Sequence, residues 1–464
     1  MRTSLPKLSL YLLLLWASNA HSENLPASVT AALQQANIPL QHVGIIVWDT
    51  DQDTPQISIN PHYPFNPAST MKLVTSYAAL SLLGPAYTWQ TEVGYDGVLH
   101  DGILDGNLYL KGNGDPSLTT ERFWLLLHQL RLGGLQRING DLIIDQSHFQ
   151  LAPSTVFDDK PYRAYNALPA ATMIDYNSTT VYLKAENGLI QLHAEPLPTN
   201  TRLINQLSID SSPCGEWRDA IHTEWLAGTR QLTFSGAYSR DCGEKTFAVS
   251  LGDASELVAD LFVTLWPAEG GIFNGNWHTG MMPDNAHSIL FYDSPPLALA
   301  VYNLNKYSNN VMARDLFLSL SQTTPASTET SAVVVHDWLA QQNLSFPELV
   351  IDNGAGLSRI ARISADSMAR LLRSAYHSPV FPELAAALPI VAVDGTMKKR
   401  DRNCAVAAHA HIKTGTLDNI KTMAGYVTMH NGHTAVIVFF IDDSHAAAGA
   451  AAQDALLEWI YQGG

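Results

Sequence analysis

Alternating apolar and polar residues predict strands near both ends of this 464-residue chain, and apolar residues at helical spacing predict helices beside them. The Asn431-Gly432 pair is a strong hairpin signal between two of the C-terminal strands. The predicted strands are residues 43–50, 56–60, 410–417, 425–430 and 434–441. The predicted helices are residues 69–83, 254–265, 308–320 and 447 onward. Helix–sheet character at both ends indicates that the two ends build one domain.

The middle of the chain has a different pattern. From about residue 87 to 246, short alternating segments are separated by Gly, Asn and Asp turns, which is typical of short strands. The clearest of them are residues 106–110, 140–145, 180–184 and 231–235. We expect 87–246 to form a mostly β insertion, with two subdomains at about 87–179 and 180–246. Residues 21–86 and 247–464 then form a discontinuous α/β (α+β) domain, an antiparallel sheet flanked by helices.

The first twenty residues have the pattern of an export signal. Arg2 and Lys7 supply positive charge, residues 8–16 are a short apolar run, and small residues end the segment at Ala20. We therefore expect an exported, periplasmic protein that begins near His21. No other segment approaches the roughly 20 apolar residues of a spanning helix, so we expect no transmembrane anchor.

Charge and motif content narrow the function further. The net charge is −16 and the chain has no basic run, which argues against binding to nucleic acid, where phosphate contacts dominate affinity. The 17 histidines form no His-Glu-x-x-His motif and the cysteines no Cys-x-x-Cys motif. We therefore expect neither a metal site nor a cofactor.

Three cysteines allow three disulfide pairings in an oxidising compartment. We expect Cys214 to pair with Cys242, because both lie in one polar, strand-rich segment. Cys404 is then left as a free thiol.

Ser69 and Lys72 are the first candidate catalytic residues. Their spacing on a predicted helix places both side chains on one face, about 5–6 Å apart at the Cβ atoms. A neutral lysine amine at that position is able to take the serine proton and so generate a nucleophile. A Ser-x-x-Lys motif alone is common by chance, so its meaning depends on the rest of the chain.

Two more motifs give that pair its significance. Ser308-Asn309-Asn310 begins a predicted helix, and Lys413-Thr414-Gly415 lies in a predicted strand. Penicillin-interacting serine enzymes carry a Ser-x-x-Lys, a Ser-Asp-Asn type triplet and a Lys-Thr-Gly in this order. Each motif alone is a chance-level match, whereas all three in order, each on a suitable element, are specific.

With these motifs the sequence resembles the penicillin-binding D-Ala-D-Ala carboxypeptidases, most closely the type-4 carboxypeptidase/endopeptidase family. Residues 112–118, 352–359 and 394–400 also match that family, and the resemblance covers nearly the whole mature chain. It implies a serine β-lactamase/DD-transpeptidase-like fold for the discontinuous domain. It also implies peptidoglycan stem peptides as substrates and β-lactam antibiotics as covalent inhibitors.

The resemblance implies a role for each motif residue. Ser69 would attack the carbonyl carbon between the terminal D-alanines and form an acyl-enzyme, with Lys72 as proton acceptor. A second cation nearby, Lys413, favours the neutral form of Lys72. Ser308 would pass the proton to the leaving amine.

Further residues are expected to bind the substrate. Asn310 would contact the substrate amide, and Lys413 with Thr414 would hold the terminal carboxylate by a charge-assisted contact. The backbone N–H groups of Ser69 and Thr416 would form the oxyanion hole. The remaining candidates are Gly415, which lets the substrate approach the strand, Arg359, which would line the site, and Asp418, which would face the substrate.

The insertion is expected to contribute a recognition site for the substrate's free amine. In the type-4 family an acidic residue has this role, and Asp158 or Asp159 lies near the matching position, with Tyr165 as a candidate aromatic wall. The chain departs from the family at Asn309, where Asp is common, and at Tyr307, where a basic residue is frequent.

Two other readings remain open. A serine β-lactamase or esterase of the same fold would need a deacylating base that the sequence does not place. A non-catalytic cell-wall-binding scaffold would not need Ser69, Lys72, Ser308 and Lys413 together. The balance between carboxypeptidase and endopeptidase activity and the oligomeric state do not follow from the sequence.

Overall fold

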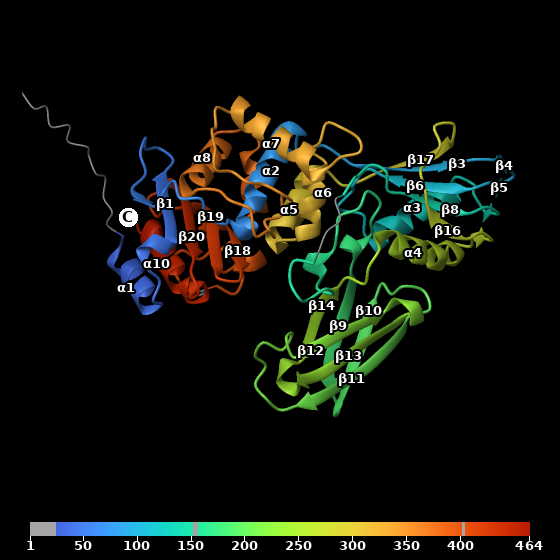
Figure 1. The fold of residues 1–464 in the computed structure, drawn as a ribbon, viewed down its shortest axis with the longest axis horizontal. Helices are drawn as coiled ribbons and strands as arrows, with labels where there is room; N and C mark the ends of the chain where they lie inside the picture. The colour runs from blue at the N-terminus through green and yellow to red at the C-terminus, as the bar shows by residue number, and fades with distance from the viewer. Residues whose placement is uncertain (1–24, 152–155, 401–403) are drawn as a thin grey trace, which may run out of the picture.

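A computed structural model describes residues 25–151, 156–400 and 404–464, and the predicted signal segment lies outside these ranges. A helix–sheet domain built from both ends of the chain adjoins a large, mostly β insertion (Figure 1). Among the described helices, none combines the length and the apolar character that crossing a bilayer requires.

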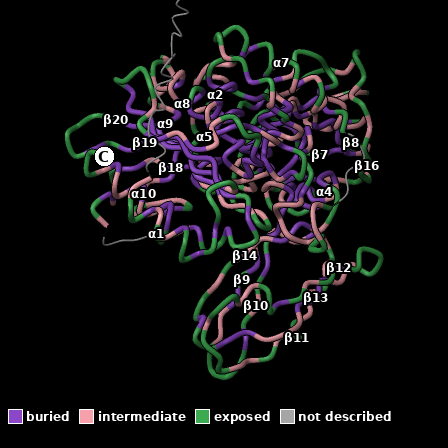
Figure 2. The backbone as a smooth tube through the Cα atoms, turned by 60° about the vertical axis from the view of Figure 1, so that its left-hand side comes forward, coloured by how far each residue is buried: buried purple, intermediate pink, exposed green. Residues whose placement is uncertain are grey.

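The helix–sheet domain is built on one five-stranded antiparallel sheet. Its strands, in spatial order, are β18 (Ala410–Leu417), β19 (Ile420–Thr428), β20 (Thr434–Asp442), β1 (Val43–Asp49) and β2 (Ile57–Ile59). The strands at the centre of this sheet are buried (Figure 2) because helices cover both faces. Along β20, Val436 and Val438 pack into the core on one face, and Ile437 and Phe439 into the core on the other. This is the period-two alternation of a strand.

Two groups of helices cover this sheet. One face packs against α1 (Ala27–Gln35) and α10 (Ala450–Tyr461), through a core that includes Leu33 and Leu456. The other face packs against a larger helical layer, whose core includes Phe317 and Trp338. The helices of this layer are α2 (Met71–Leu82), α5 (Leu297–Tyr307), α6 (Asn310–Leu318), α7 (Thr328–Gln341), α8 (Ala365–Tyr376) and α9 (Phe381–Ala387). The expected antiparallel sheet flanked by helices is therefore confirmed.

The insertion has a proximal part with two sheets and two helices. One sheet has the order β16-β8-β6-β3-β17 and the other β15-β7-β5-β4. The elements are β3 (Gln90–Tyr95), β4 (Val98–His100), β5 (Ile103–Asp105), β6 (Leu108–Gly112), β7 (Arg137–Ile138), β8 (Leu142–Asp145), β15 (Ile272–Phe273), β16 (Trp277–Thr279), β17 (His287–Asp293), α3 (Thr120–Leu132) and α4 (Ala254–Ala268). Side chains from both helices and from these strands share one core.

This arrangement corrects the expected end of the insertion. We expected the chain to return to the helix–sheet domain at residue 247, but α4 contributes Phe262 and Trp266 to the core of the insertion. Strand β17 also pairs along β3. The insertion therefore continues to about residue 293, because the apolar face of α4 is buried against insertion strands.

The distal part of the insertion consists of two small sheets (Figure 1). The first contains β10 (Leu189–Glu195), β9 (Thr179–Glu186) and β14 (Glu244–Val249), and the second contains β11 (Arg202–Asp210), β13 (Gln231–Ser239) and β12 (Ile221–Leu226). A disulfide joins Cys214 to Cys242, the pair expected from the sequence. Cys404 is half-buried in the helix–sheet domain and takes no part in this disulfide.

Candidate active site

Ser69 lies in a 3₁₀ turn, Ala68–Thr70, directly before α2. The turn is held by Asn66, whose Oδ1 accepts a hydrogen bond from the Ala68 N–H at 2.9 Å. Ala68 has a φ of +45°, a conformation that costs energy for residues other than glycine. Gly356 packs so closely that a Cβ there would be 1.8 Å from the Ala68 carbonyl oxygen. The position of Ser69 is thus fixed by its surroundings as well as by the helix.

Lys72 lies one helical turn further and is completely buried. Its Nζ donates to Asn310 Oδ1 and to the Ala355 carbonyl oxygen, each at 2.6 Å, and lies 2.9 Å from Ser69 Oγ. The first two partners are oxygens that only accept hydrogen bonds. A neutral amine has two N–H groups, which these oxygens occupy, and one lone pair. The lone pair is therefore left for the Ser69 hydroxyl proton.

Burial lowers the pKa of Lys72 well below its usual value, and the positive charges of Lys413 and Arg314 lower that pKa further. Each effect penalises the charged form of the amine. The neutral form, which leaves a lone pair for the Ser69 proton, is therefore the form that the electrostatics favour.

Lys413 lies on β18, also completely buried, and donates to Ser308 Oγ at 2.8 Å and to the Thr414 carbonyl oxygen at 2.9 Å. Burial lowers the pKa of Lys413 to about 7. The structure thus brings the three sequence motifs together: Lys72 links the first to the second, and Lys413 links the second to the third.

The second motif is positioned by a helix start. Ser308 ends α5 in a left-handed conformation, with φ +56°, and Asn309 caps α6. The Asn309 side chain accepts hydrogen bonds from the backbone N–H groups of Val311 and Met312 at 2.9 and 3.1 Å. Asn and Asp are equally good in this capping role, which explains why Asn is tolerated where Asp is common.

Gly415 lies where β18 passes the start of α2. A Cβ at this position would be 2.7 Å from the Ser69 backbone nitrogen and 2.4 Å from Thr422 Oγ1. Only glycine allows this approach without displacing the turn that carries Ser69.

Two cavities meet at the nucleophile, and Ser69, Ser308 and Thr416 line both of them. The first cavity has a volume of about 650 Å³ and is lined by two carboxylates, one lysine and several aromatic side chains, among them Asp158, Asp418, Lys160, Tyr165 and Tyr176. The second has a volume of about 520 Å³ and is lined by basic and hydroxyl side chains, namely Lys399, Arg400, Lys421, Thr396 and Thr414. The charge of the surroundings therefore changes sign across Ser69.

The structure distinguishes the two acidic candidates of the insertion. Asp158 lines the first cavity and accepts hydrogen bonds from Tyr165 Oη at 2.7 Å and Asn166 Nδ2 at 2.9 Å. Burial raises the pKa of Asp158, but these hydrogen bonds, together with the backbone N–H and the positive charge of Lys160, outweigh it; the net pKa is lowered, which keeps the carboxylate ionised. Asp159 is exposed and is not among the described residues that line this cavity.

Arg359 reaches the site only through another side chain, not directly as we expected. Its guanidinium stacks on the Phe157 ring, 4.5 Å from the centroid, and donates to the Phe157 carbonyl oxygen at 3.2 Å. Phe157 lines the first cavity, whereas Arg359 lines a neighbouring one. The sequence analysis missed Phe157 and also the Ala355 carbonyl oxygen that binds Lys72. No motif marks a carbonyl or a loop phenylalanine for such a role.

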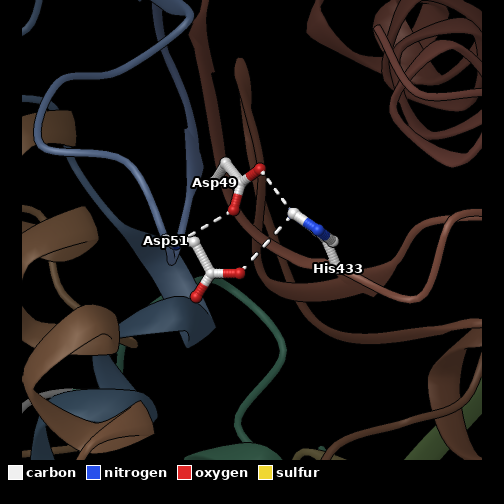
Figure 3. A group of neighbouring side chains, drawn as sticks. All are labelled: Asp49, Asp51 and His433. Atoms are coloured by element: carbon white, nitrogen blue, oxygen red, sulfur yellow. Dashed lines mark hydrogen bonds and ion pairs between the residues drawn. The ribbon is translucent and has the colours of Figure 1, made fainter.

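A different cluster has side chains that are able to hold a metal. Asp49, Asp51 and His433 bring one ligand atom each to within 4.8 Å of one another (Figure 3). None of the three lines either cavity at Ser69.

A model of the D-Ala-D-Ala carboxypeptidase 3 (S13) family matches residues 25–462. The D-alanyl-D-alanine carboxypeptidase of Actinomadura sp. strain R39 is 26% identical, over 95% of this chain and 85% of the relative. The D-alanyl-D-alanine carboxypeptidase DacB of Haemophilus influenzae is 25% identical, over 86% of this chain and 85% of the relative.

Two solved structures share the fold. Penicillin binding protein 4 from Haemophilus influenzae superposes with a TM-score of 0.78 at 24% identity, covering 93% of this chain and 99% of that one. The Bd3459 predatory endopeptidase from Bdellovibrio bacteriovorus superposes with a TM-score of 0.53 at 14% identity, covering 90% and 93%. At these identities the likeness concerns the fold.

Proposed function

Because the chain belongs to the D-Ala-D-Ala carboxypeptidase 3 (S13) family, we propose that it is a periplasmic serine peptidase that cleaves D-Ala-D-Ala ends of peptidoglycan stem peptides through an acyl-enzyme on Ser69. β-Lactams would inhibit it by acylating the same oxygen. The main support is the buried Lys72 amine, which lies 2.9 Å from Ser69 Oγ and whose lowered pKa favours the neutral form that accepts the Ser69 proton.

In the first step, Lys72 takes the Ser69 hydroxyl proton while Oγ forms a bond to the carbonyl carbon of the penultimate D-Ala. The negative charge moves to the carbonyl oxygen, where the backbone N–H groups of Ser69 and Thr416 would stabilise it. The C–N bond then breaks, and the leaving amine receives the proton from Lys72 by way of Ser308. Lys413 is placed for this relay because it donates to Ser308 Oγ at 2.8 Å.

In the second step, water attacks the ester carbon and gives a proton to Lys72. The bond to Ser69 Oγ breaks, Oγ recovers the proton, and the shortened peptide leaves with a new carboxylate. Asn310 and the Ala355 carbonyl oxygen hold the Lys72 amine in place for both steps.

A fluorescent penicillin tests this proposal. Wild-type protein should form a stable adduct and release D-Ala from a stem pentapeptide, and Ser69→Ala should do neither. Rapid turnover of the penicillin would instead indicate a β-lactamase, and no adduct with the wild type would indicate a non-catalytic scaffold.

The basic cavity supports cleavage of cross-links as a second activity of the same site. Thr414 and Thr416 line it, so it lies on the side where the leaving group departs. No acidic side chain is among the described residues that line it, although the chain as a whole carries a net charge of −16. A D-Ala–diamino acid cross-link releases a larger leaving group with more than one carboxylate, which this basic surface would attract.

Digestion of defined monomeric and cross-linked muropeptides tests the second activity. A Lys399→Gln/Lys421→Gln variant should lose more cross-link cleavage than D-Ala release, whereas Lys398→Gln, which changes an exposed lysine outside the cavity, should change neither. Equal losses of both activities in the double variant would remove the argument for a cross-link site.

A further inference from the structure

Asp49, Asp51 and His433 form a cluster on the helix–sheet domain that the peptidase mechanism does not use. Asp49 is the last residue of β1, Asp51 follows in the next turn, and His433 directly precedes β20 (Figure 3). His433 Nδ1 lies 3.3 Å from Asp49 Oδ2 and 3.5 Å from Asp51 Oδ2. One imidazole nitrogen therefore faces two carboxylate oxygens at nearly equal distances.

The two contacts are a long hydrogen bond and a long ion pair, and their lengths also fit ligands of a shared centre. Charge-assisted N–H···O bonds are about 2.7–2.9 Å long, which is shorter than both distances. Nδ1 also has at most one proton, so it serves only one of the two oxygens. In a tetrahedral site with metal–ligand bonds of about 2.0–2.1 Å, neighbouring ligand atoms are about 3.3–3.4 Å apart. The two nitrogen–oxygen distances match this spacing, and all three ligand atoms lie within 4.8 Å of one another.

Another histidine–carboxylate cluster of the same domain gives the contrast. Asp443 contacts His42 Nδ1 at 2.6 Å and His445 Nδ1 at 3.0 Å. Each of its two oxygens serves one histidine, and both distances are in the hydrogen-bond range. That cluster is a pair of short hydrogen bonds, one to each carboxylate oxygen, whereas at the end of β1 one nitrogen has two longer contacts with two different carboxylates.

The backbone fixes the ligand positions. Asp49 Oδ1 accepts a hydrogen bond from the Asp51 N–H at 3.0 Å, which orients Oδ2 toward His433. The Thr50 N–H donates to the Thr434 carbonyl oxygen at 2.9 Å and so holds the turn against the start of β20. Ligands that are oriented by such outer contacts need little rearrangement to bind a metal.

The two carboxylates also lack another cation. Over the described residues, the ion pairs of Asp49 and Asp51 are made with His433 alone. Arg373 lies close by, but its guanidinium donates to the Gln52 carbonyl oxygen at 2.9 Å and stacks on Trp48 at 4.1 Å from the ring centroid. A divalent cation would neutralise both carboxylates and leave the imidazole neutral.

We propose that Asp49, Asp51 and His433 form a binding site for Zn²⁺ that clamps the turn after β1 to the start of β20. Two carboxylate oxygens and one imidazole nitrogen suit Zn²⁺, whereas Mg²⁺ and Ca²⁺ prefer oxygen ligands alone. The three residues leave one tetrahedral position open to solvent. Because the site binds the folded state, Zn²⁺ should stabilise the protein.

The test is zinc titration of the mature wild-type protein after dialysis against EDTA. We expect one Zn²⁺ bound at micromolar concentration and a higher midpoint of thermal unfolding, reversed by EDTA, with no such rise for Mg²⁺. Asp51→Asn and His433→Gln should each weaken zinc binding at least tenfold. Both side chains are largely exposed, so these variants should fold.

His100→Gln is the matched control, because His100 faces a single carboxylate, Asp105, at 3.8 Å in the insertion. It should bind zinc as the wild type does. The proposal is wrong if the wild type binds no zinc at micromolar concentration, or if Asp51→Asn and His433→Gln bind it as tightly as His100→Gln does. Labelling with fluorescent penicillin shows independently that each variant is folded.

Discussion

The two walls of the cleft around Ser69 differ in how their charged side chains are held. In the helix–sheet domain, Lys72 and Lys413 are completely buried on α2 and β18, and every contact of their amines is with a fixed oxygen. In the insertion, Asp158 and Tyr165 are half-buried in a loop and hold each other at 2.7 Å.

This difference indicates that the two walls have different functions. A buried amine destabilises the fold unless all its hydrogen-bond partners are in place. The wall that carries Lys72 and Lys413, which we call the lysine wall, therefore tolerates few substitutions and keeps one geometry. The half-buried side chains of the second wall, Asp158 and Tyr165, remain partly hydrated, so replacing them costs less folding free energy. We call this second wall the insertion wall. We expect changes in the first wall to affect the chemical step and changes in the second to affect the choice of substrate.

The strongest test of this division is Lys72→Met, which keeps the length of the side chain and removes the base. Penicillin acylation should become slower by about 10³–10⁴-fold, the upper range for loss of a general base. The rate of adduct formation measures this. Lys398→Met, at an exposed position outside both cavities, should acylate normally. A loss of less than tenfold in Lys72→Met would assign the base to another group.

Changing the pH tests the second lysine of the same wall. In the proposed role, the charged form of Lys413 would hold the substrate carboxylate, and that form predominates below its pKa of about 7. As the pH rises through that value, kcat/KM for a peptide with a free carboxylate should fall by up to about tenfold per pH unit. The same peptide with an amidated C-terminus should lack this fall. A kcat/KM that does not change between pH 7 and 9 would contradict the assigned role.

Asp158→Asn tests the insertion wall. If Asp158 holds the free amine of the stem peptide, kcat/KM should decrease about tenfold for a substrate with that amine, the loss of one charge-assisted contact. The decrease should vanish when the amine is acetylated. Asp159→Asn is the matched control and should leave kcat/KM unchanged for both substrates. If Asp158→Asn also slowed acylation by penicillin, Asp158 would act in the chemical step. The proposed separation of roles between the two walls would then be wrong.

Arg359→Gln should have the smallest effect. It removes a stack on Phe157 of about 0.5–1 kcal/mol, and KM for the stem peptide should rise about two- to fivefold with kcat unchanged. Steady-state kinetics on one peptide measure both values. A fall in kcat would mean that Arg359 acts on the reacting groups after all.

The lysine wall was largely predictable from the sequence because its residues lie on regular elements. Ser69 and Lys72 meet through the local spacing of a helix, and Ser308, Asn310 and Lys413 follow from two further short motifs. The structure adds the register of β18 and the capping role of Asn309, which fix the positions of these residues but do not change which residues form the site.

The insertion wall and the outer parts of the fold were less predictable, because long-range contacts decide them. Asp158 and Asp159 are neighbours, and only the hydrogen bonds from Tyr165 and Asn166 determine which one faces the cleft. The apolar face of α4 fits either domain by pattern alone, so the boundary near residue 293 became visible only in the structure. Asp49 and His433 are 384 residues apart in the chain, and no local motif joins them.

The pairing of β1 with β20 also has a consequence for the order of folding. Val43 lies beside Ile441 and Asp49 beside Ala435, so the central pair of the sheet joins the two ends of the chain. The proximal insertion, in contrast, pairs its strands within residues 90–293. During synthesis the insertion can therefore fold first, while β1 waits for a partner made almost 400 residues later. Until that strand arrives, β1 has only the three-residue strand β2 beside it, and its other edge and apolar side chains stay uncovered unless a holding chaperone binds them.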